Sequence, residues 1–403
     1  MRPLAEGRWR ALAVLSVVLV LAMTPWFSAS AVVPQLRVLW GLSGGTASWL
    51  TIGVQLGFVG GAVLSSFFNL ADIVAPHHVV FAGALGATLV NALLLVAGGP
   101  ATAIALRLAT GFFLAAVYPP ALKLMATWFV RGRGVALGIL VAAISLGSAA
   151  PHLINGLGGL DWRVVIVVTS LATLLGAVLV ELVVREGPFP FPAAVFDPRQ
   201  IGGVVRNRAV RLASFGYFGH MWELFAALAW FLPFFADSLR EAGRPSGTFA
   251  AFATFAFVAA GAPGSWLGGV LADRWGRTRT TALMMAISGT CAILIGLTFG
   301  GSPWMLLAVA MVWGFTVAAD SAQFSAIVTE TASQAYVGTA LTLQLAVGFL
   351  LTGVTIRLIP YVESTMGWRW AFAFLAPGPL FGSIAMLYLR TLPEAQGIAG
   401  GRG

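Results

Sequence analysis

His220 and Glu223 are ionisable residues in the middle of a long apolar run, and they stand three positions apart. In a helix, this spacing places both side chains on one face. If that helix enters hydrocarbon near Leu212, Glu223 lies about 16 Å deep at a rise of about 1.5 Å per residue. An ionisable group at that depth is costly to bury, so the pair predicts proton coupling. The alternative is a buried pair in which each residue satisfies the other for packing specificity.

Asp320 is a third ionisable residue within an apolar run, near Trp313 and Gln323 on the same predicted helix. We expect Asp320 to take part in proton coupling, or else to cap a neighbouring helix or pair with an arginine. Arg107 and Lys123 lie near the two ends of an earlier run. Each can bind an anion, and each is close enough to water to act as an interfacial anchor whose charged end stays solvated.

Aromatic side chains cluster at one level of several apolar runs. Such side chains suit an organic solute with an apolar or π-bearing part better than a small inorganic ion. The predicted solute cavity combines aromatic, hydroxyl, amide and basic side chains: Trp26, Phe27, Ser30, Arg107, Tyr118, Lys123, Tyr217, Trp313 and Gln323.

The elements that carry these residues are predicted membrane spans. Hydrophobic residues make up 59% of the chain and charged residues 9%, against about 25% charged residues in soluble domains. The apolar runs have helix length, contain glycine and proline, and lack the alternation of barrel strands, so we expect an all-α membrane protein. The twelve predicted helices lie near residues 11–34, 48–69, 79–98, 102–127, 134–157, 164–184, 209–236, 248–271, 280–299, 304–327, 338–360 and 370–390.

The chain is predicted to consist of two six-helix halves, residues 1–184 and 209–403, joined by a polar linker over residues 185–208. The halves resemble copies of one another, because similar residues recur in the same order about 200 positions apart. Gly111 with Phe112 and Gly314 with Phe315 are one such match, at an offset of 203.

The formal net charge of +9 is concentrated in alternate loops. Lysine and arginine are enriched in cytoplasmic loops of membrane proteins, so this distribution predicts that both termini lie in the cytoplasm and argues against a nucleic-acid partner. Cys291 is the only cysteine, which excludes an intramolecular disulfide. The sequence has no phosphate-binding loop, no nucleophile and base at workable spacing, and no clustered metal ligands. We therefore expect no enzyme activity, catalytic residue, cofactor or metal.

A charged loop between two apolar runs, residues 269–279, contains the pattern G-x-x-x-D-R-x-G-R. Gly269 lies one turn before Asp273 and is expected to let a neighbouring helix approach closely. Asp273 can cap the next helix or accept a hydrogen bond from Arg277. Arg274 adds a further charge, and Gly276 permits the chain reversal.

This pattern resembles the loop that follows the second and eighth spans in the major facilitator superfamily of secondary transporters. In the first half of the chain only the acid of the pattern is kept, as Asp72. The resemblance implies two parallel repeats with a substrate site between them near the membrane midplane, and gating by the loop of residues 269–279 together with Asp72.

The resemblance further implies a multi-pass transporter of the cytoplasmic (inner) membrane that works as a monomer by alternating access. The expected partners are protons, the lipid bilayer and a small organic solute, with an anionic metabolite as one option. An alternative of the same fold is a polyspecific antiporter of drugs and protons. An alternative of another class is a membrane receptor that binds its ligand without moving it.

Overall fold

The computed structural model describes the chain except for residues 1, 69, 130–132, 160, 190–195 and 334–335, and it leaves the side chains of residues 2–6, 71, 72, 133 and 134 undescribed as well. All regular structure in the described part of the chain is helical. Eleven of its helical segments are long and apolar enough to cross a membrane. A further long helix, α1, precedes them. The predicted all-α membrane fold is confirmed.

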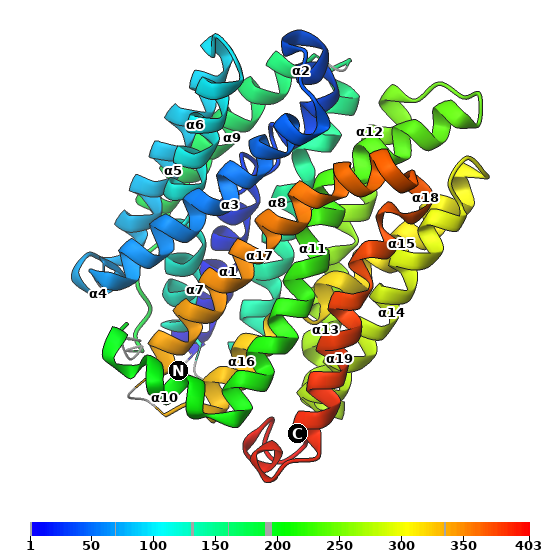
Figure 1. Cartoon of the computed structure of the whole chain (residues 1–403). Helices are drawn as coiled ribbons and strands as arrows, with labels where there is room; N and C mark the ends of the chain where they lie inside the picture. Colours follow the sequence, from blue (N-terminus) through cyan, green and yellow to red (C-terminus); the bar gives the residue numbers. More distant parts are fainter. Residues whose placement is uncertain (1, 69, 130–132, 160, 190–195, 334–335) are drawn as a thin grey trace. The chain divides into compact units, whose positions relative to one another are not determined.

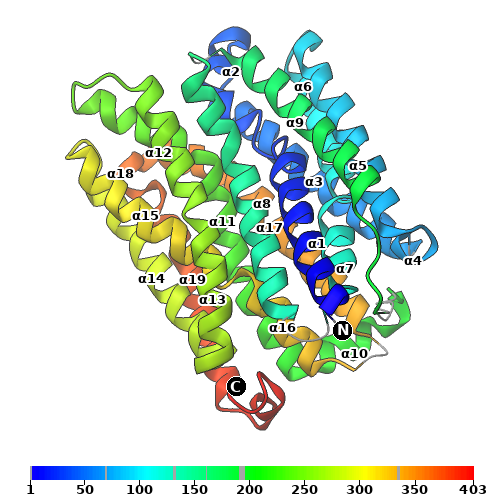
Figure 2. The same ribbon diagram turned by 180° about the vertical axis from the view of Figure 1, so that it is seen from behind.

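The chain folds as two compact units, Met1–Ala193 and Ala194–Gly403. The helices of the first unit, drawn from blue to green in Figures 1 and 2, are α1 (Arg2–Ala22), η1 (Ser30–Val32), α2 (Val33–Trp40), α3 (Gly44–Phe67), α4 (Leu70–Ile73), α5 (Pro76–Ala92), η2 (Leu93–Val96), α6 (Pro100–Leu114), α7 (Tyr118–Ala126), α8 (Arg133–Leu157) and α9 (Trp162–Val183).

The helices of the second unit are η3 (Pro198–Gln200), α10 (Ile201–Arg206), α11 (Arg208–Glu241), α12 (Gly247–Ala259), α13 (Gly261–Trp275), α14 (Arg277–Leu297), α15 (Pro303–Ala319), α16 (Ser321–Thr331), α17 (Val337–Met366), α18 (Trp368–Ala371), η4 (Ala373–Leu375), α19 (Pro377–Arg390) and η5 (Pro393–Gly397). The boundary between the units falls inside the predicted linker, and part of that linker lies outside the described residues. The exact division into halves and linker stays a prediction.

Several predicted spans are interrupted. The first is broken between α1 and η1, where Pro25 lies in a series of turns. The fourth and the eighth are each broken shortly before a proline, Pro119 and Pro263. A proline lacks the amide hydrogen and crowds the preceding turn, which explains these three breaks. The tenth span is broken at Asp320, where no proline is present.

The second and fourth spans of each unit approach closely through glycine, at matching positions. A Cβ atom on Gly111 of α6 would lie 1.9 Å from the carbonyl oxygen of Val54 on α3. A Cβ atom on Gly314 of α15 would lie 2.0 Å from the carbonyl oxygen of Phe257 on α12. Gly314 and Phe257 each stand 203 positions after their counterparts. The same contact thus occurs once in each unit.

A second glycine contact repeats with the same offset. A Cβ atom would lie 2.4 Å from the carbonyl oxygen of Phe112 if it were added to Gly61, and 2.0 Å from that of Phe315 if it were added to Gly264. Real Cβ atoms are not found at such distances from a carbonyl oxygen, so the helices can lie this close only because glycine occupies these positions. The repeated contacts support the internal duplication that the sequence predicts.

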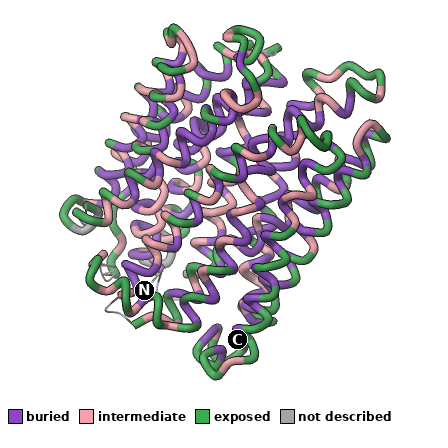
Figure 3. Tube along the Cα trace, in the orientation of Figure 1, coloured by how far each residue is buried: buried purple, intermediate pink, exposed green. Residues whose placement is uncertain are grey.

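Apolar side chains remain exposed along the spans, where Figure 3 shows exposed and buried residues alternating along the helices. On α9, Leu171, Leu175 and Leu182 are 60%, 52% and 70% exposed. Their spacing places them on one side of the helix. Such an exposed apolar stripe suits contact with lipid.

Candidate functional site

Glu223 lies near the middle of α11 and is 1% exposed. Its Oε2 atom accepts a hydrogen bond of 2.8 Å from the Ser288 hydroxyl on α14. Its Oε1 atom accepts one of 2.7 Å from the Trp313 indole nitrogen on α15. The carboxyl group is therefore held by donors from two other helices, and each of its oxygens has one donor.

Asp320, at the break between α15 and α16, is paired with His220 on α11. The two atoms closest to each other are His220 Nδ1 and Asp320 Oδ1, 2.8 Å apart, and both side chains are almost fully buried. The second ring nitrogen of His220, Nε2, has no hydrogen-bond partner in the described part of the chain. Nδ1 and Asp320 Oδ1 are likewise without a hydrogen bond of good geometry among the described residues, so the 2.8 Å contact is an ion pair by distance and not an aligned hydrogen bond.

His220 and Glu223 do not satisfy each other, although the sequence suggests that they share a helix face. Glu223 is directed to α14 and α15, whereas His220 is directed to the break at Asp320. Neighbours on one helix face can point to different helices when several helices pack around that face. The predicted pair is therefore two adjacent buried polar sites, one turn apart on α11.

Aromatic rings line both polar sites. The ring of Tyr217 is stacked on His220 at 6.1 Å, and the ring of Phe324 lies 5.7 Å from it. Trp313, which donates to Glu223, is fully buried and contacts the rings of Phe257 and Phe372. These rings keep the surroundings of the two polar sites apolar.

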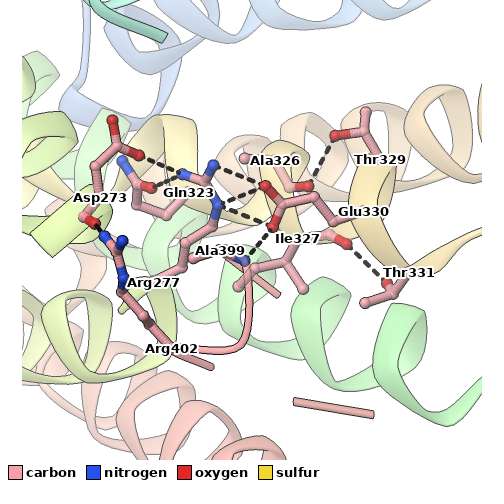
Figure 4. Close-up of polar contacts among 10 residues, drawn as sticks. All are labelled: Asp273, Arg277, Gln323, Ala326, Ile327, Thr329, Glu330, Thr331, Ala399 and Arg402. Atoms are coloured by element: carbon pink, nitrogen blue, oxygen red, sulfur yellow. Dashed lines mark hydrogen bonds and ion pairs between the residues drawn. The ribbon is translucent and has the colours of Figure 1, made fainter. Parts of the chain in front are cut away.

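Arg277, the first residue of α14, connects three helices at one end of the second unit (Figure 4). Its Nε donates to both carboxylate oxygens of Glu330 on α16, at 3.1 and 3.0 Å, and its Nη2 donates to Glu330 Oε1 at 2.8 Å. Its Nη1 donates to Gln323 Oε1 at 2.9 Å and lies 3.7 Å from Asp273 Oδ1 on α13. We call Asp273, Arg277, Gln323 and Glu330 the Arg277 junction.

The Arg277 junction differs from the expected gating loop in its main acidic partner. The contact with Asp273 is present, but Glu330 on α16 lies closer to Arg277 and accepts hydrogen bonds from it with both carboxylate oxygens. Gly276 has a φ of 97°, which glycine adopts without strain, and it separates α13 from α14 as expected. Arg274 is exposed, and the side chain of Asp72 lies outside the described residues.

The close approach predicted at Gly269 is wrong. A Cβ atom on Gly269 would meet nothing within 4 Å, whereas one on Gly268 would lie 2.0 Å from the carbonyl oxygen of Ala319 on α15. The neighbouring helix passes on the side of Gly268, because residues next to each other on a helix point in directions about 100° apart.

Arg107 in the first unit is fully buried, so its expected position near water is also wrong. Its guanidinium donates to three backbone carbonyls, those of Pro25, Trp26 and Leu50, at 2.9, 2.5 and 3.2 Å. It also donates to Ser28 Oγ at 3.1 Å. Arg107 thus holds the interrupted part of the first span through these hydrogen bonds, and its predicted part in a solute cavity stays a prediction.

The other predicted cavity residues of the first unit lie in its core or at half-buried positions. Ser30 hydrogen-bonds Thr51 at 2.7 Å, and the ring of Phe58 lies between Trp26 and Tyr118, at 4.9 and 6.3 Å. Phe27 is buried and Lys123 is half-buried. The remaining predicted cavity residues, Tyr217, Trp313 and Gln323, belong to the second unit and lie around the sites described above.

Two polar residues were missed by the sequence reasoning. One is Ser288, whose hydroxyl contacts Glu223 and is one of many small polar groups in the spans. The other is Asn91 on α5, which accepts from Ser28 at 2.7 Å and donates to Ser170 at 2.9 Å. Asn91 could have been recognised as a candidate from the sequence, because it is an asparagine inside an apolar run. Ser288 could not, because the spans contain many small polar groups. Among the described residues, no group of three or more His, Cys, Asp or Glu side chains is arranged to hold a metal ion.

Comparison with known proteins gives matches over most of the chain. A sequence model of the Major Facilitator Superfamily matches residues 15–240 and 213–403. A puromycin resistance protein of Streptomyces alboniger is 29% identical over 183 residues, a stretch that covers 44% of this chain and 36% of that protein.

Two solved structures are similar in fold. One is a bacterial homologue of the human lysosomal transporter Spinster, in an inward-facing and unoccupied conformation, with a TM-score of 0.70, 15% identity and 97% of each chain covered. The other is a D-xylose–proton symporter, with a TM-score of 0.73, 14% identity, and 96% of this chain and 98% of that chain covered.

Proposed function

The chain belongs to the Major Facilitator Superfamily, a family of transporters and not of enzymes, and on this basis we propose that it moves a small organic solute by alternating access, driven by protons. The protons are bound at Glu223 and at the pair of His220 and Asp320. Both polar sites are buried within one unit and lie one turn apart on α11.

The partners of Glu223 support proton binding because they suit both of its protonation states. The Trp313 indole can only donate, so Glu223 Oε1 accepts in both protonation states, and the proton of the neutral acid is carried by Oε2. The Ser288 hydroxyl has one proton and two acceptors within reach, Glu223 Oε2 at 2.8 Å and the Met285 carbonyl oxygen at 3.1 Å. Ser288 donates to an ionised Glu223. A protonated Glu223 donates to Ser288, which then donates to Met285.

The three contacts that would allow this exchange, of Glu223 with Trp313 and Ser288 and of Ser288 with Met285, are the observation on which the proposal rests. A buried polar group that loses its partner is costly, so most buried carboxyl groups favour one protonation state strongly. At Glu223 a proton can be taken up and released while the carboxyl group keeps its hydrogen bonds with Trp313 and Ser288; only the Ser288 hydrogen bond to the Met285 carbonyl is gained or lost. The charge of Asp320 acts on Glu223, and on this ground we propose that protonation of the two carboxyl groups is coupled.

The aromatic contacts support an organic solute with an apolar or π-bearing part. Trp26, Phe58 and Tyr118 form a continuous series of ring contacts in the first unit. In the second unit, Tyr217 and Phe324 flank His220. An anionic solute has less support, because Arg107 is fully buried and already donates to three backbone carbonyls and to Ser28.

The location and assembly that we propose follow from the charge distribution and the fold. Arginine and lysine in alternate loops favour the cytoplasmic membrane with both termini in the cytoplasm. The two units correspond to six-helix halves joined by a cytoplasmic linker, and the transporter works as a monomer that uses no cofactor.

The experiment that tests the function uses the purified full chain in liposomes and a panel of labelled organic solutes selected by growth of a deletion strain. We expect one solute class to accumulate when a pH gradient is imposed. The Glu223→Gln variant keeps the size of the side chain but fixes it in a neutral form, so pH-driven accumulation is lost while exchange of solute for solute survives.

Glu241→Gln, an exposed position at the end of the same helix, is the matched control and should behave like the parent. Accumulation by Glu223→Gln at the parent's level would show that Glu223 is structural.

A second candidate, an antiporter of drugs and protons, is favoured by the similarity to a puromycin resistance protein. In this role Glu223 and Asp320 would attract lipophilic cations. Cells that express the chain would then survive puromycin or cationic dyes at concentrations that kill the empty-vector strain, and carboxylate solutes would not be moved. Unchanged sensitivity to these compounds would exclude this candidate.

A further inference from the structure

The last residues of the described chain fold back onto the end of the second unit. After α19, the chain forms η5 and then returns toward the loop that joins α13 and α14. Ile398 is fully buried, and Ala395 is 7% exposed. These two apolar side chains fix the returning segment, residues 393–403, against the helices of its own unit.

The returning segment makes three polar contacts with the Arg277 junction and its surroundings, and Figure 4 shows the two made by Ala399 and Arg402. The Arg402 guanidinium donates to the backbone carbonyl of Asp273. The amide of Ala399 donates to Glu330 Oε2 at 3.0 Å. The Thr278 hydroxyl, which is buried, donates to the carbonyl oxygen of Gly403 at 2.5 Å.

Gly276 explains how the segment can lie so close to the loop. A Cβ atom at this position would lie 2.3 Å from the carbonyl oxygen of Arg402 and 2.7 Å from that of Gly403. The side chain of any other residue at this position would displace the segment. Its backbone would also be strained, because φ at this position is 97°. Gly276 therefore serves two purposes: the reversal between α13 and α14, and the docking of residues 402–403.

We propose that residues 393–403 are a strap that holds the Arg277 junction closed. The junction joins α13 through Asp273, α14 through Arg277 and α16 through Glu330. The strap contacts all three of these helices, through Asp273, Thr278 and Glu330. The three helix ends can separate only after the strap has dissociated from them. Release of the strap therefore regulates the conformation of the Arg277 junction from a place outside the proton sites.

The test measures hydrogen exchange of the backbone amides in the full chain, held in nanodiscs, and compares residues 269–280 between variants. Arg402→Ala removes the contact with Asp273. Thr278→Val keeps the side-chain volume but removes the donor to Gly403. In each variant we expect exchange in residues 269–280 to be about three- to tenfold faster than in the parent, as the loss of a single hydrogen bond predicts.

A chain that ends at Ile398 should show a larger increase than either variant, and high salt should accelerate exchange in the parent because the contacts of Arg402 and Glu330 are exposed to solvent. Arg390→Ala is the control, because it removes an exposed arginine at the end of α19 that lies outside the junction. It should leave exchange at the parent's rate.

Two results would overturn the proposal. One is unchanged exchange in residues 269–280 in both Arg402→Ala and the chain that ends at Ile398. The other is an increase that is spread over all of α11 to α19 and accompanied by a lower Tm, which would show that the segment supports the whole unit and does not act on the junction.

Discussion

Ser288 and Trp313 hold the same carboxyl group in different ways, and the difference determines how Glu223 can bind a proton. The indole of Trp313 never accepts a hydrogen bond, whereas the hydroxyl of Ser288 can reverse its direction. Ser288 is therefore the residue of the site whose loss should affect the pH dependence of transport more than binding of the solute.

Replacement of Ser288 by alanine is predicted to raise the pH of half-maximal transport by about one unit. The ionised carboxylate loses a charge-assisted hydrogen bond worth about 1.5–3 kcal/mol, while the neutral form loses one worth about 0.5–1.5 kcal/mol. The ionised form is thus weakened more. The measurement is a pH profile of solute uptake in liposomes, with Thr290→Ala, an exposed hydroxyl on the same helix, as the control. An unchanged profile would remove Ser288 from the proton pathway.

Arg107→Lys is predicted to destabilise the first unit by about 1–3 kcal/mol, because an ammonium group cannot replace the forked contacts of a guanidinium with several carbonyls. Thermal unfolding in detergent measures this loss as a lower Tm. Arg163→Lys, which changes an exposed arginine near Trp162, provides the comparison and should leave Tm unchanged. Equal Tm values for the two variants would contradict the structural role of Arg107.

Sequence reasoning identified Glu223, His220 and Asp320 as exceptional because burial of ionisable groups in hydrocarbon is costly. It could not determine that His220 pairs with Asp320, since this contact depends on how α11 packs against a break that lies a hundred residues later. It also placed Arg107 near the end of its span, with its charged group close to water, whereas the side chain is fully buried. Two of the three carbonyls that hold Arg107, those of Pro25 and Trp26, become available only where the first span is interrupted, and hydrophobicity does not reveal such an interruption.

At the scale of the helices, most spans were predicted to within a few residues, because a bilayer demands long apolar runs; the largest differences are at the first span, where α1 begins at Arg2 and not near residue 11, and at the eleventh, where α17 ends at Met366 and not near residue 360. The breaks were not read from the pattern, although Pro25, Pro119 and Pro263 stand at or after three of them. The glycine that makes a close helix contact was also not predictable to the exact position. Gly269 and Gly268 differ by one position in the sequence, but only Gly268 faces the neighbouring helix.

Two glycines on α3 provide a test of close helix packing. A Cβ atom on Gly57 would lie 1.8 Å from the carbonyl oxygen of Leu108, whereas one on Gly60 would meet nothing within 4 Å. We predict that Gly57→Ala forces α3 and α6 apart and costs about 1–3 kcal/mol. Gly60→Ala should be neutral or slightly stabilising. Thermal unfolding of the two variants checks the difference, and equal Tm values would refute the contact.

At the scale of the whole molecule, the internal duplication was visible in the sequence as a series of weak matches. The repeated contacts of Gly111 with Val54 and of Gly314 with Phe257 make it a property of the packing. The offset could be read from the sequence, but the pairing of the second span with the fourth could not, because it depends on side-chain shape and not on periodicity.

Each compact unit is predicted to keep its own fold when the chain is cut within residues 190–195 and the two pieces are expressed separately. Each piece has its own buried core and its own glycine-mediated helix pair. In limited proteolysis in nanodiscs, the paired helices of each piece should resist cleavage. These are α3 and α6 in the first piece and α13 and α15 in the second. Rapid digestion of either piece would show that the units are not independent.

The glycine-lined pairing of α3 with α6 also has a consequence during synthesis. The two helices are separated in the chain by α5, so α3 leaves the ribosome about 50 residues before its partner. At translation rates of about 5–20 residues per second, α3 waits roughly 3–10 s in the membrane before α6 arrives. Throughout this interval its small-residue face is open to other helices, including those of newly made copies. The order of synthesis therefore leaves the nascent chain with a period in which incorrect helix pairing competes with the native contact.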